Sequence, residues 1–187
     1  MKHLGTRELE TERLLLRRLT VADAEAMYHN WASDEEVTRF LSWPANESVQ
    51  VTEATLRHWE SEYAKNNYYH WGIVPKEVGE PIGTISVVDQ DDSTEMVHIG
   101  YCIGKQWWGK GYTSEALNRL LQFFFEEVGV NRIESQHDTR NPGSGRVMEK
   151  CGLQHEGTSR QSSRNNQGIC DTVHYAILKE DYLIGAN

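Results

Sequence analysis

Residues 104–116 read GKQWWGKGYTSEA, and they lie between an alternating run typical of a strand and a long apolar pattern typical of a helix. Gly109 and Gly111 allow the backbone to curl closely around a ligand, because neither carries a Cβ. The first N–H groups of a helix have no intrahelical partner, and the helix dipole adds partial positive charge there. The stretch therefore predicts a strand-to-helix turn that binds an anion such as a diphosphate.

Two polar side chains of the same stretch suit an anionic ligand. Lys110 can add positive charge, and Gln106 can donate an amide hydrogen bond. The spacing differs from both the Walker A loop and G-x-G-x-x-G, so ATP and NAD fit it poorly. The competing interpretation is a tight turn without a ligand, which an isolated G-x-G would favour. The Q-x-x-G-x-G spacing at a strand-to-helix junction favours a binding loop.

The remaining pattern predicts a strand and two helices, then three antiparallel strands over residues 68–103, then alternating helices and strands. Thr20 and Asp23 form a capping pattern that begins the first helix. Gly129 is expected to end the helix after the glycine stretch, and Gly152 to end a short helix. The other expected segments are a strand near 14–18, a helix near 48–65, a strand over 132–138, a short helix within 141–152, and strands over 153–161 and 170–178.

These motifs resemble the GNAT superfamily of N-acetyltransferases, whose acetyl-CoA loop reads Q/R-x-x-G-x-G/A. Residues 106–111 match that loop, while IGYCIG before it and NPGSGRVMEKCG after it are similar to the ribosomal-protein N-terminal (Rim-type) branch. The likeness covers nearly the whole chain. It implies an α/β (α+β) fold in one domain over residues 1–187, with a mixed, mostly antiparallel sheet of about seven strands and about four helices.

The resemblance also implies the activity, which is direct transfer of an acetyl group from acetyl-CoA, as co-substrate, to a primary amine. In such enzymes the amine attacks the thioester carbonyl and the CoA thiolate leaves. The expected acceptor is a protein N-terminal α-amine. The alternatives are a small amine, such as a polyamine, an amino acid or an antibiotic, and a module that binds acyl-CoA without turnover. Dimers are common in this branch, so a homodimer is an expected assembly, although no stretch identifies its interface.

The resemblance places the cofactor-binding residues on three segments. The strand before the glycine stretch offers backbone groups to the pantetheine arm, the stretch itself holds the diphosphate, and Asn141 binds the pantetheine amides. The expected cofactor-binding residues are Tyr101, Cys102, Ile103, Gln106, Trp108, Gly109, Lys110, Gly111, Tyr112, Thr113, Ser114, Asn141 and Ser144.

Two residues are the catalytic candidates. His98 shares a strand face with Met96, Gly100 and Cys102, and its imidazole suits the base that frees the amine; the alternative is a histidine packed in the sheet. Many family members use a Tyr in the short helix to protonate the thiolate, but Met148 occupies that position. Ser144 is expected to hydrogen-bond the CoA sulfur instead, or to cap the short helix.

Composition excludes several other classes. The chain has 19 Lys and Arg against 28 Asp and Glu, and its net charge of −9 disfavours nucleic-acid binding. No apolar run approaches the roughly 20 residues of a membrane span, so a soluble cytoplasmic protein with no membrane partner is expected. The scattered cysteines and histidines lack metal-ligand spacing, so no metal is predicted, and a cysteine nucleophile is disfavoured because no Cys-His arrangement is present.

Overall fold

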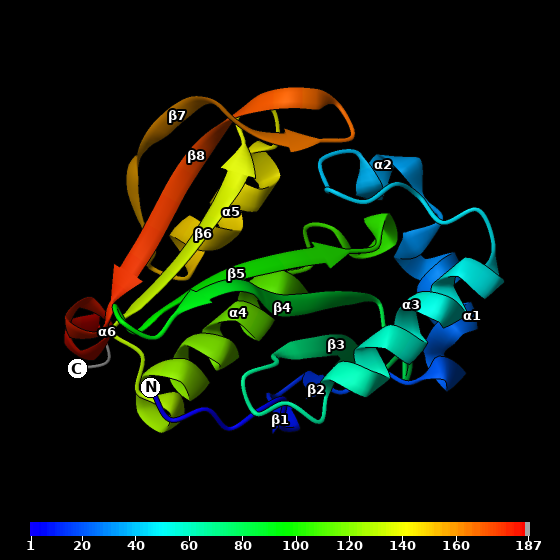
Figure 1. The fold of residues 1–187 in the computed structure, drawn as a ribbon, viewed down its shortest axis with the longest axis horizontal. Coiled ribbons are helices and arrows are strands. Elements are labelled where there is room, and N and C mark those ends of the chain that lie inside the picture. The colour runs from blue at the N-terminus through cyan, green and yellow to red at the C-terminus, as the bar shows by residue number, and fades with distance from the viewer. Residues whose placement is uncertain (186–187) are drawn as a thin grey trace.

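Eight strands form the sheet at the centre of the computed structural model (Figure 1), which describes residues 1–185. Their order is β1-β2-β3-β4-β5-β6-β8-β7, and all neighbouring pairs are antiparallel except β5 and β6. The strands are β1 (Leu9–Glu10), β2 (Leu14–Arg17), β3 (His70–Pro75), β4 (Gly83–Asp91), β5 (Met96–Ile103), β6 (Arg132–Asp138), β7 (Gln154–Asn165) and β8 (Gly168–Leu178).

The helices begin and end largely at the capping and glycine positions that the sequence indicates. Asp23 accepts a hydrogen bond from Thr20 N at 2.8 Å, as the capping pattern predicts. Gly129, at φ 81°, ends the helical segment that follows the glycine stretch, whose last turns are π-helical over Phe123–Val128. The α-helices are α1 (Ala24–Met27), α2 (Glu35–Thr38), α3 (Val49–Glu62), α4 (Tyr112–Gln122), α5 (Pro142–Lys150) and α6 (Lys179–Gly185).

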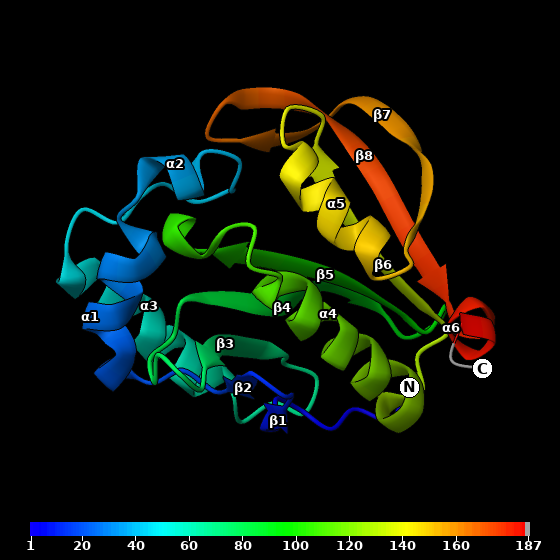
Figure 2. The same ribbon diagram turned by 180° about the vertical axis from the view of Figure 1, so that it is seen from behind.

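Two apolar clusters cover the two faces of the sheet. On β3, Trp71 and Ile73 are buried in the larger cluster, together with Phe123 and Phe124 from the α4 segment. Gly72 points to the other face, where an added Cβ would lie 2.3 Å from a Leu19 methyl carbon of the smaller cluster. Figure 2 shows α4 and α5 in front of the sheet, on the side of the larger cluster. Period-two alternation along β3 therefore fixes which helices lie on which side.

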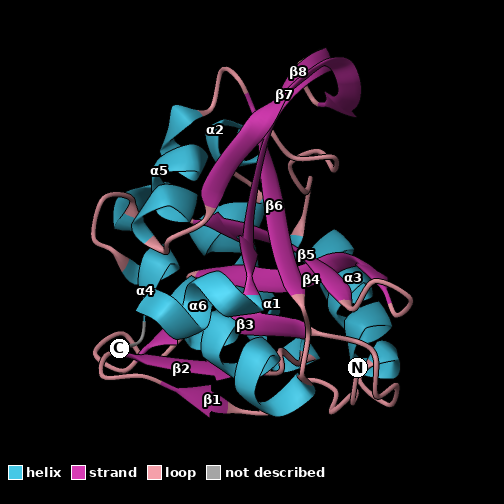
Figure 3. Ribbon diagram, turned by 90° about the vertical axis from the view of Figure 1, so that its left-hand side faces the viewer, coloured by secondary structure: helices cyan, strands magenta, loops and turns pink. Residues whose placement is uncertain are grey.

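The sheet opens between β5 and β6. Their parallel ladder consists of three pairs, Met96 with Arg132, Val97 with Ile133 and His98 with Glu134. Figure 3 shows β6, β8 and β7 running steeply across the direction of β1 to β5. The C-terminal ends of β5 and β6 therefore diverge, and this divergence creates the site described below.

The expected mixed, mostly antiparallel fold is confirmed. The sheet has one strand more than expected because the two-residue β1 pairs with Leu15 and Leu16 at its edge. The short helices α2 and α6 were not predicted. Each is seven residues or fewer, which is too short to develop the apolar periodicity on which sequence prediction depends.

Candidate active site

The centre of the site is the gap between the diverging ends of β5 and β6. At the point where their ladder stops, the Ser135 hydroxyl donates to Ile99 O at 2.7 Å. On its other edge, β5 remains paired with β4 as far as Ile103, which lies opposite Gly83. The last residues of β5 therefore present one edge to the gap while the other edge is held by the sheet.

A cleft of about 480 Å³ occupies this gap, a volume in the range of small-molecule sites. Its walls come from the end of β5, the glycine stretch and the start of α4, the first turns of α5, and the segment around α2. The lining residues are Val37, Phe40, Leu41, Tyr101, Cys102, Ile103, Trp107, Trp108, Gly109, Gly111, Tyr112, Thr113, Ser114, Asn141, Pro142, Gly143, Ser144, Arg146, Val147 and Lys150.

The glycine stretch forms the predicted turn between a strand and a helix. Gly109 and Gly111 have φ values of 74° and 82°, in the left-handed region that glycine tolerates best. The first backbone hydrogen bond within α4 is donated by Glu115 to Gly111 O at 3.0 Å, so the amides of residues 112–114 precede it. Because these residues line the cleft, their amides suit the diphosphate that the sequence predicts.

The turn is anchored to the start of the chain. Glu115 in the first turn of α4 pairs with Arg13, with 2.6 Å between Oε2 and Nη2, and accepts from the Thr11 hydroxyl at 2.6 Å. Arg13 also donates to Lys110 O at 3.2 Å and lies over the Tyr112 ring. These contacts hold the loop in position against the β1–β2 turn.

The two tryptophans of the stretch have different environments. Trp107 is buried in the larger apolar cluster. Trp108 lines the cleft, is 46% exposed, and donates from Nε1 to Ile103 O at 2.8 Å. Trp108 thus fixes the angle between β5 and the turn that follows it.

Two expected ligand contacts lie outside the cleft lining. The side chains of Gln106 and Lys110 are exposed, and neither residue is among those that line the cleft. Arg146 and Lys150 on α5 supply the cationic lining instead. Their i, i+4 spacing, which places both on one helix face, is the sequence signal that could have identified them.

The start of α5 brings Asn141 and Ser144 to the cleft. Asn141 is the N-cap, and Pro142 occupies the first helical position, so the interpretation of Ser144 as the cap is wrong. Ser144 donates instead from Oγ to Tyr101 Oη at 3.2 Å, and Tyr101 Oη donates to Ser144 O at 2.9 Å. Burial raises the pKa of Tyr101, so its phenol keeps its proton. The Tyr101 side chain was missed, because only its backbone was expected to act.

A model of the acetyltransferase (GNAT) domain family matches residues 13–154 of the chain. The chain belongs to the GNAT acetyltransferase family. It is therefore an acetyl-CoA-dependent acyltransferase. The amides of the turn, the cationic side chains of α5 and the free edge of β5 fit the diphosphate and amide groups of that co-substrate.

The similarity to relatives and to solved structures extends over almost the whole chain. The uncharacterized N-acetyltransferase YoaA of Bacillus subtilis is 33% identical over 171 residues, covering 91% of this chain and 96% of that protein. The Bacillus subtilis protein named "Putative ribosomal N-acetyltransferase YdaF" is 29% identical over 174 residues, covering 91% and 94%. A GNAT-family acetyltransferase structure from Bacillus anthracis has a TM-score of 0.81 and 25% identity, covering 93% and 99%.

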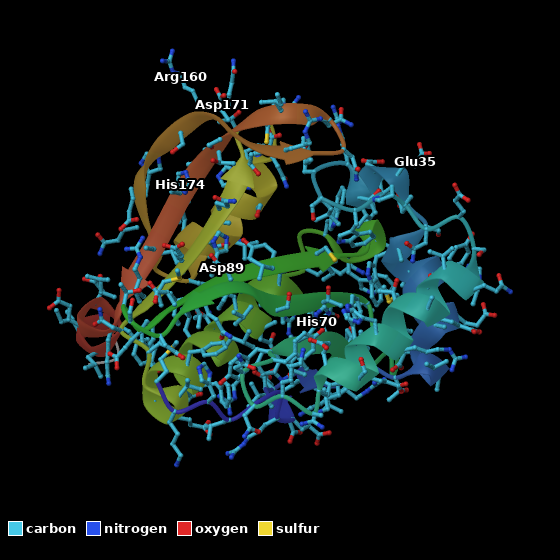
Figure 4. The ribbon with its side chains drawn as sticks, viewed as in Figure 1. Glu35, His70, Asp89, Arg160, Asp171 and His174 are labelled. Atoms are coloured by element: carbon cyan, nitrogen blue, oxygen red, sulfur yellow. The ribbon has the colours of Figure 1, made fainter. Side chains whose placement is uncertain are left out.

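His98 lies on the face of β5 opposite the buried Val97 and Ile99, as alternation predicts, and outside the lining of the GNAT cleft. Its side chain is 15% exposed, and Nδ1 lies 3.5 Å from Glu134 Oε1. Burial lowers the pKa of His98, although Glu134 and Asp89 act to raise it. Figure 4 labels Asp89 on β4 and His174 on β8, the other titratable groups whose charges act on this imidazole.

The cysteines are not arranged as nucleophiles. Burial raises the pKa of Cys102, whose thiol lies 3.4 Å from Thr84 Oγ1. Burial also raises the pKa of Cys151, to about 12, and its thiol donates to Ser114 O. Both thiols therefore stay protonated at neutral pH, which disfavours a cysteine nucleophile.

Within residues 1–185 no group of three or more His, Cys, Asp or Glu side chains is placed to hold a metal ion. No helix in that part of the chain is long and apolar enough to cross a bilayer.

The glycine turn gives a matched pair of substitutions. Gly109 lines the cleft at φ 74°, while Gly79 has φ 79° in a turn away from it, and an added Cβ would meet nothing within 4 Å at either position. Gly109→Ala and Gly79→Ala should therefore each destabilise the protein by about 1 to 2 kcal/mol. We expect Gly109→Ala alone to weaken CoA binding, by at least about tenfold, because only this methyl group is added to a residue that lines the cleft. Calorimetric titration with CoA measures the affinity of each variant. Equal affinities for the two variants would contradict the assignment of the glycine turn as the binding site of the diphosphate.

Proposed function

We propose that the acceptor of this acetyltransferase is a protein N-terminal α-amine. The observation that carries the proposal is the composition of the cleft lining, which among the described residues contains no carboxylate and no imidazole. Freeing the lone pair of an alkylamine with a pKa of about 10.4 costs about 4 to 5 kcal/mol at pH 7. An α-amine with a pKa of about 8 costs only about 1.4 kcal/mol, so it needs little help from a base.

A relative and the charge of the chain also favour this acceptor. The relative YdaF carries a ribosomal acetyltransferase name and matches this chain along nearly its whole length. The net charge of −9 suits a cationic acceptor such as a protonated N-terminus. A small amine satisfies the charge argument equally well, so the two acceptor classes have to be separated by experiment.

The acceptor class is tested by measuring CoA release from acetyl-CoA with two sets of amines. One set consists of short peptides with free N-termini, and the other of a polyamine, free lysine and an aminoglycoside. We expect kcat/KM for the best peptide to exceed that of every alkylamine by at least about tenfold, following the difference in deprotonation cost. A faster alkylamine would contradict the proposal, and acetyl-CoA binding with no release for any amine would contradict turnover itself.

We propose that Tyr101 and Ser144 together provide the proton for the leaving group. Their hydroxyls lie 3.2 Å apart in the cleft, at the junction of β5 and α5. Attack of the amine on the thioester expels the CoA thiolate, which needs a proton donor within reach. The Tyr101 phenol is held in its protonated form by burial, and Met148 leaves α5 without a tyrosine of its own at the expected position.

Removing the hydroxyls tests this role. Tyr101→Phe should lower kcat at least about tenfold with little change in acetyl-CoA affinity, as expected for loss of a general acid. Ser144→Ala should have a smaller effect, several-fold, because Tyr101 keeps its bond to the Ser144 carbonyl. Tyr175→Phe is the matched control, since that hydroxyl is also hydrogen-bonded, to Glu149 at 2.9 Å, but lies outside the cleft lining. An unchanged kcat for Tyr101→Phe would remove the pair from the mechanism.

We propose that His98, which lies outside the cleft lining on the opposite face of β5, is the base that completes the small deprotonation an α-amine still requires. An acceptor that enters from the His98 face of β5 would reach the gap from the side opposite α5. Because burial lowers the pKa of His98, the imidazole is neutral at pH 7 and free to accept a proton.

The pH dependence of the reaction tests this assignment. For the wild type, kcat should fall as the pH drops through the lowered pKa of His98, below about 6.5. His98→Gln should lower kcat at pH 7, remove this acidic limb and leave acetyl-CoA affinity unchanged, whereas the exposed His155→Gln should behave as wild type. A His98→Gln enzyme with an unaltered pH profile would show that the histidine only packs in the sheet.

A further inference from the structure

Residues 36–43, the α2 strap, cross the wide end of the gap between β5 and β6. The strap contains the end of α2 and the turn that follows it, where Leu41 N donates to Thr38 O at 2.8 Å. It contributes Val37, Phe40 and Leu41 to the cleft lining, the apolar part of the walls that does not come from the sheet, the glycine stretch, α4 or α5.

One end of the strap is tied to the β5 side of the gap. The carboxylate of Glu36 accepts a hydrogen bond from the ammonium group of Lys105, which lies in the turn directly after β5. Both side chains are about half exposed, so this ion pair contributes little by itself.

The other end of the strap is tied to the tip of the β7–β8 hairpin by Asn166. The Asn166 side-chain amide donates to Thr38 O at 2.8 Å and to Trp43 O at 2.7 Å, and its backbone N–H donates to Leu41 O at 3.1 Å. Figures 1 and 2 both show this hairpin tip reaching toward α2. One residue therefore fixes three carbonyls of a segment more than 120 positions earlier in the chain.

The hairpin tip is itself fixed to the end of β6. Asn165 donates from Nδ2 to Asp138 Oδ2 at 2.7 Å. Asp138 also accepts from Arg140, whose guanidinium lies 5.9 Å from the centre of the Phe40 ring in the strap. Arg140 holds the pKa of Asp138 well below its usual range, so the carboxylate remains charged and available to these donors.

We infer that Asn166 is a positioning residue for the transferase reaction: it holds the α2 strap across the gap as the apolar wall against which the thioester end of acetyl-CoA is placed. A primary amide is suited to this role because its NH₂ group has two donors, and both are used here. An aspartate of the same shape would replace Nδ2 by one carboxylate oxygen, which would then face two carbonyl oxygens. The inference goes beyond the proposed function, because it depends on acetyl-CoA binding and not on the identity of the acceptor.

Kinetics of Asn166→Asp and Asn166→Ala test the inference. Loss of two hydrogen bonds at an exposed position should raise KM for acetyl-CoA about 5- to 30-fold and change kcat less than about threefold, because the wall acts on binding. Gln167→Ala is the control, since Gln167 is the adjacent exposed tip residue and donates to Asn165 Oδ1 through its backbone. This control should keep the wild-type KM and kcat.

Hydrogen–deuterium exchange of the ligand-free variants gives the second measurement. Asn166→Asp should speed amide exchange within residues 38–43 and leave exchange in α4 and the thermal midpoint close to wild type. A strap that exchanges faster with no change in KM would overturn the positioning role. A loss of kcat and thermal midpoint in parallel, with faster exchange throughout, would overturn it as well, because it would show a general loss of structure.

Discussion

The site depends on the early end of the β5–β6 ladder. After three residue pairs the strands separate, and the Ser135 hydroxyl takes the place of a backbone partner for Ile99 O. From there to Ile103, β5 is paired with β4 on one edge and has no strand partner on the other edge within residues 1–185. An unpaired strand edge presents backbone N–H and C=O groups without partners, and these groups can bind an extended ligand as they would bind a further strand. The pantetheine arm of acetyl-CoA is such a ligand.

The walls around this edge differ in chemical character, and each suits a different part of acetyl-CoA. The turn after β5 offers free amides at a helix start, and α5 adds Arg146 and Lys150. The strap on the far side of the cleft offers Val37, Phe40 and Leu41. A cleft that is polar and cationic on two walls and apolar on a third suits a ligand with a diphosphate at one end and an acyl thioester at the other.

The sequence was most informative where the signal was local. The strand, turn and helix around residues 104–116 were predicted because two closely spaced glycines, strand alternation before them and helical apolar periodicity after them are adjacent in the sequence. Most of the expected ligand residues line the cleft for the same reason. Gln106 and Lys110 do not, because a motif fixes the backbone of a loop but not the direction of its exposed side chains.

Contacts between distant parts of the chain could not be predicted in this way. The Tyr101–Ser144 pair depends on the angle between β5 and α5, which no local pattern encodes. The bonds from Asn166 to the strap join segments that have no sequence relation, and α2 is too short to show a period. The GNAT motifs therefore indicated the co-substrate, while the contacts between distant segments had to come from the three-dimensional arrangement.

The most direct measurement of the central claim is amide hydrogen exchange of the wild-type protein with and without CoA. If the free edge of β5 and the start of α4 hold the ligand, CoA should slow exchange in residues 100–103 and 109–114 more than anywhere else in the sheet. Tight CoA binding that leaves both stretches unprotected would contradict the account, because the ligand would then occupy a different surface.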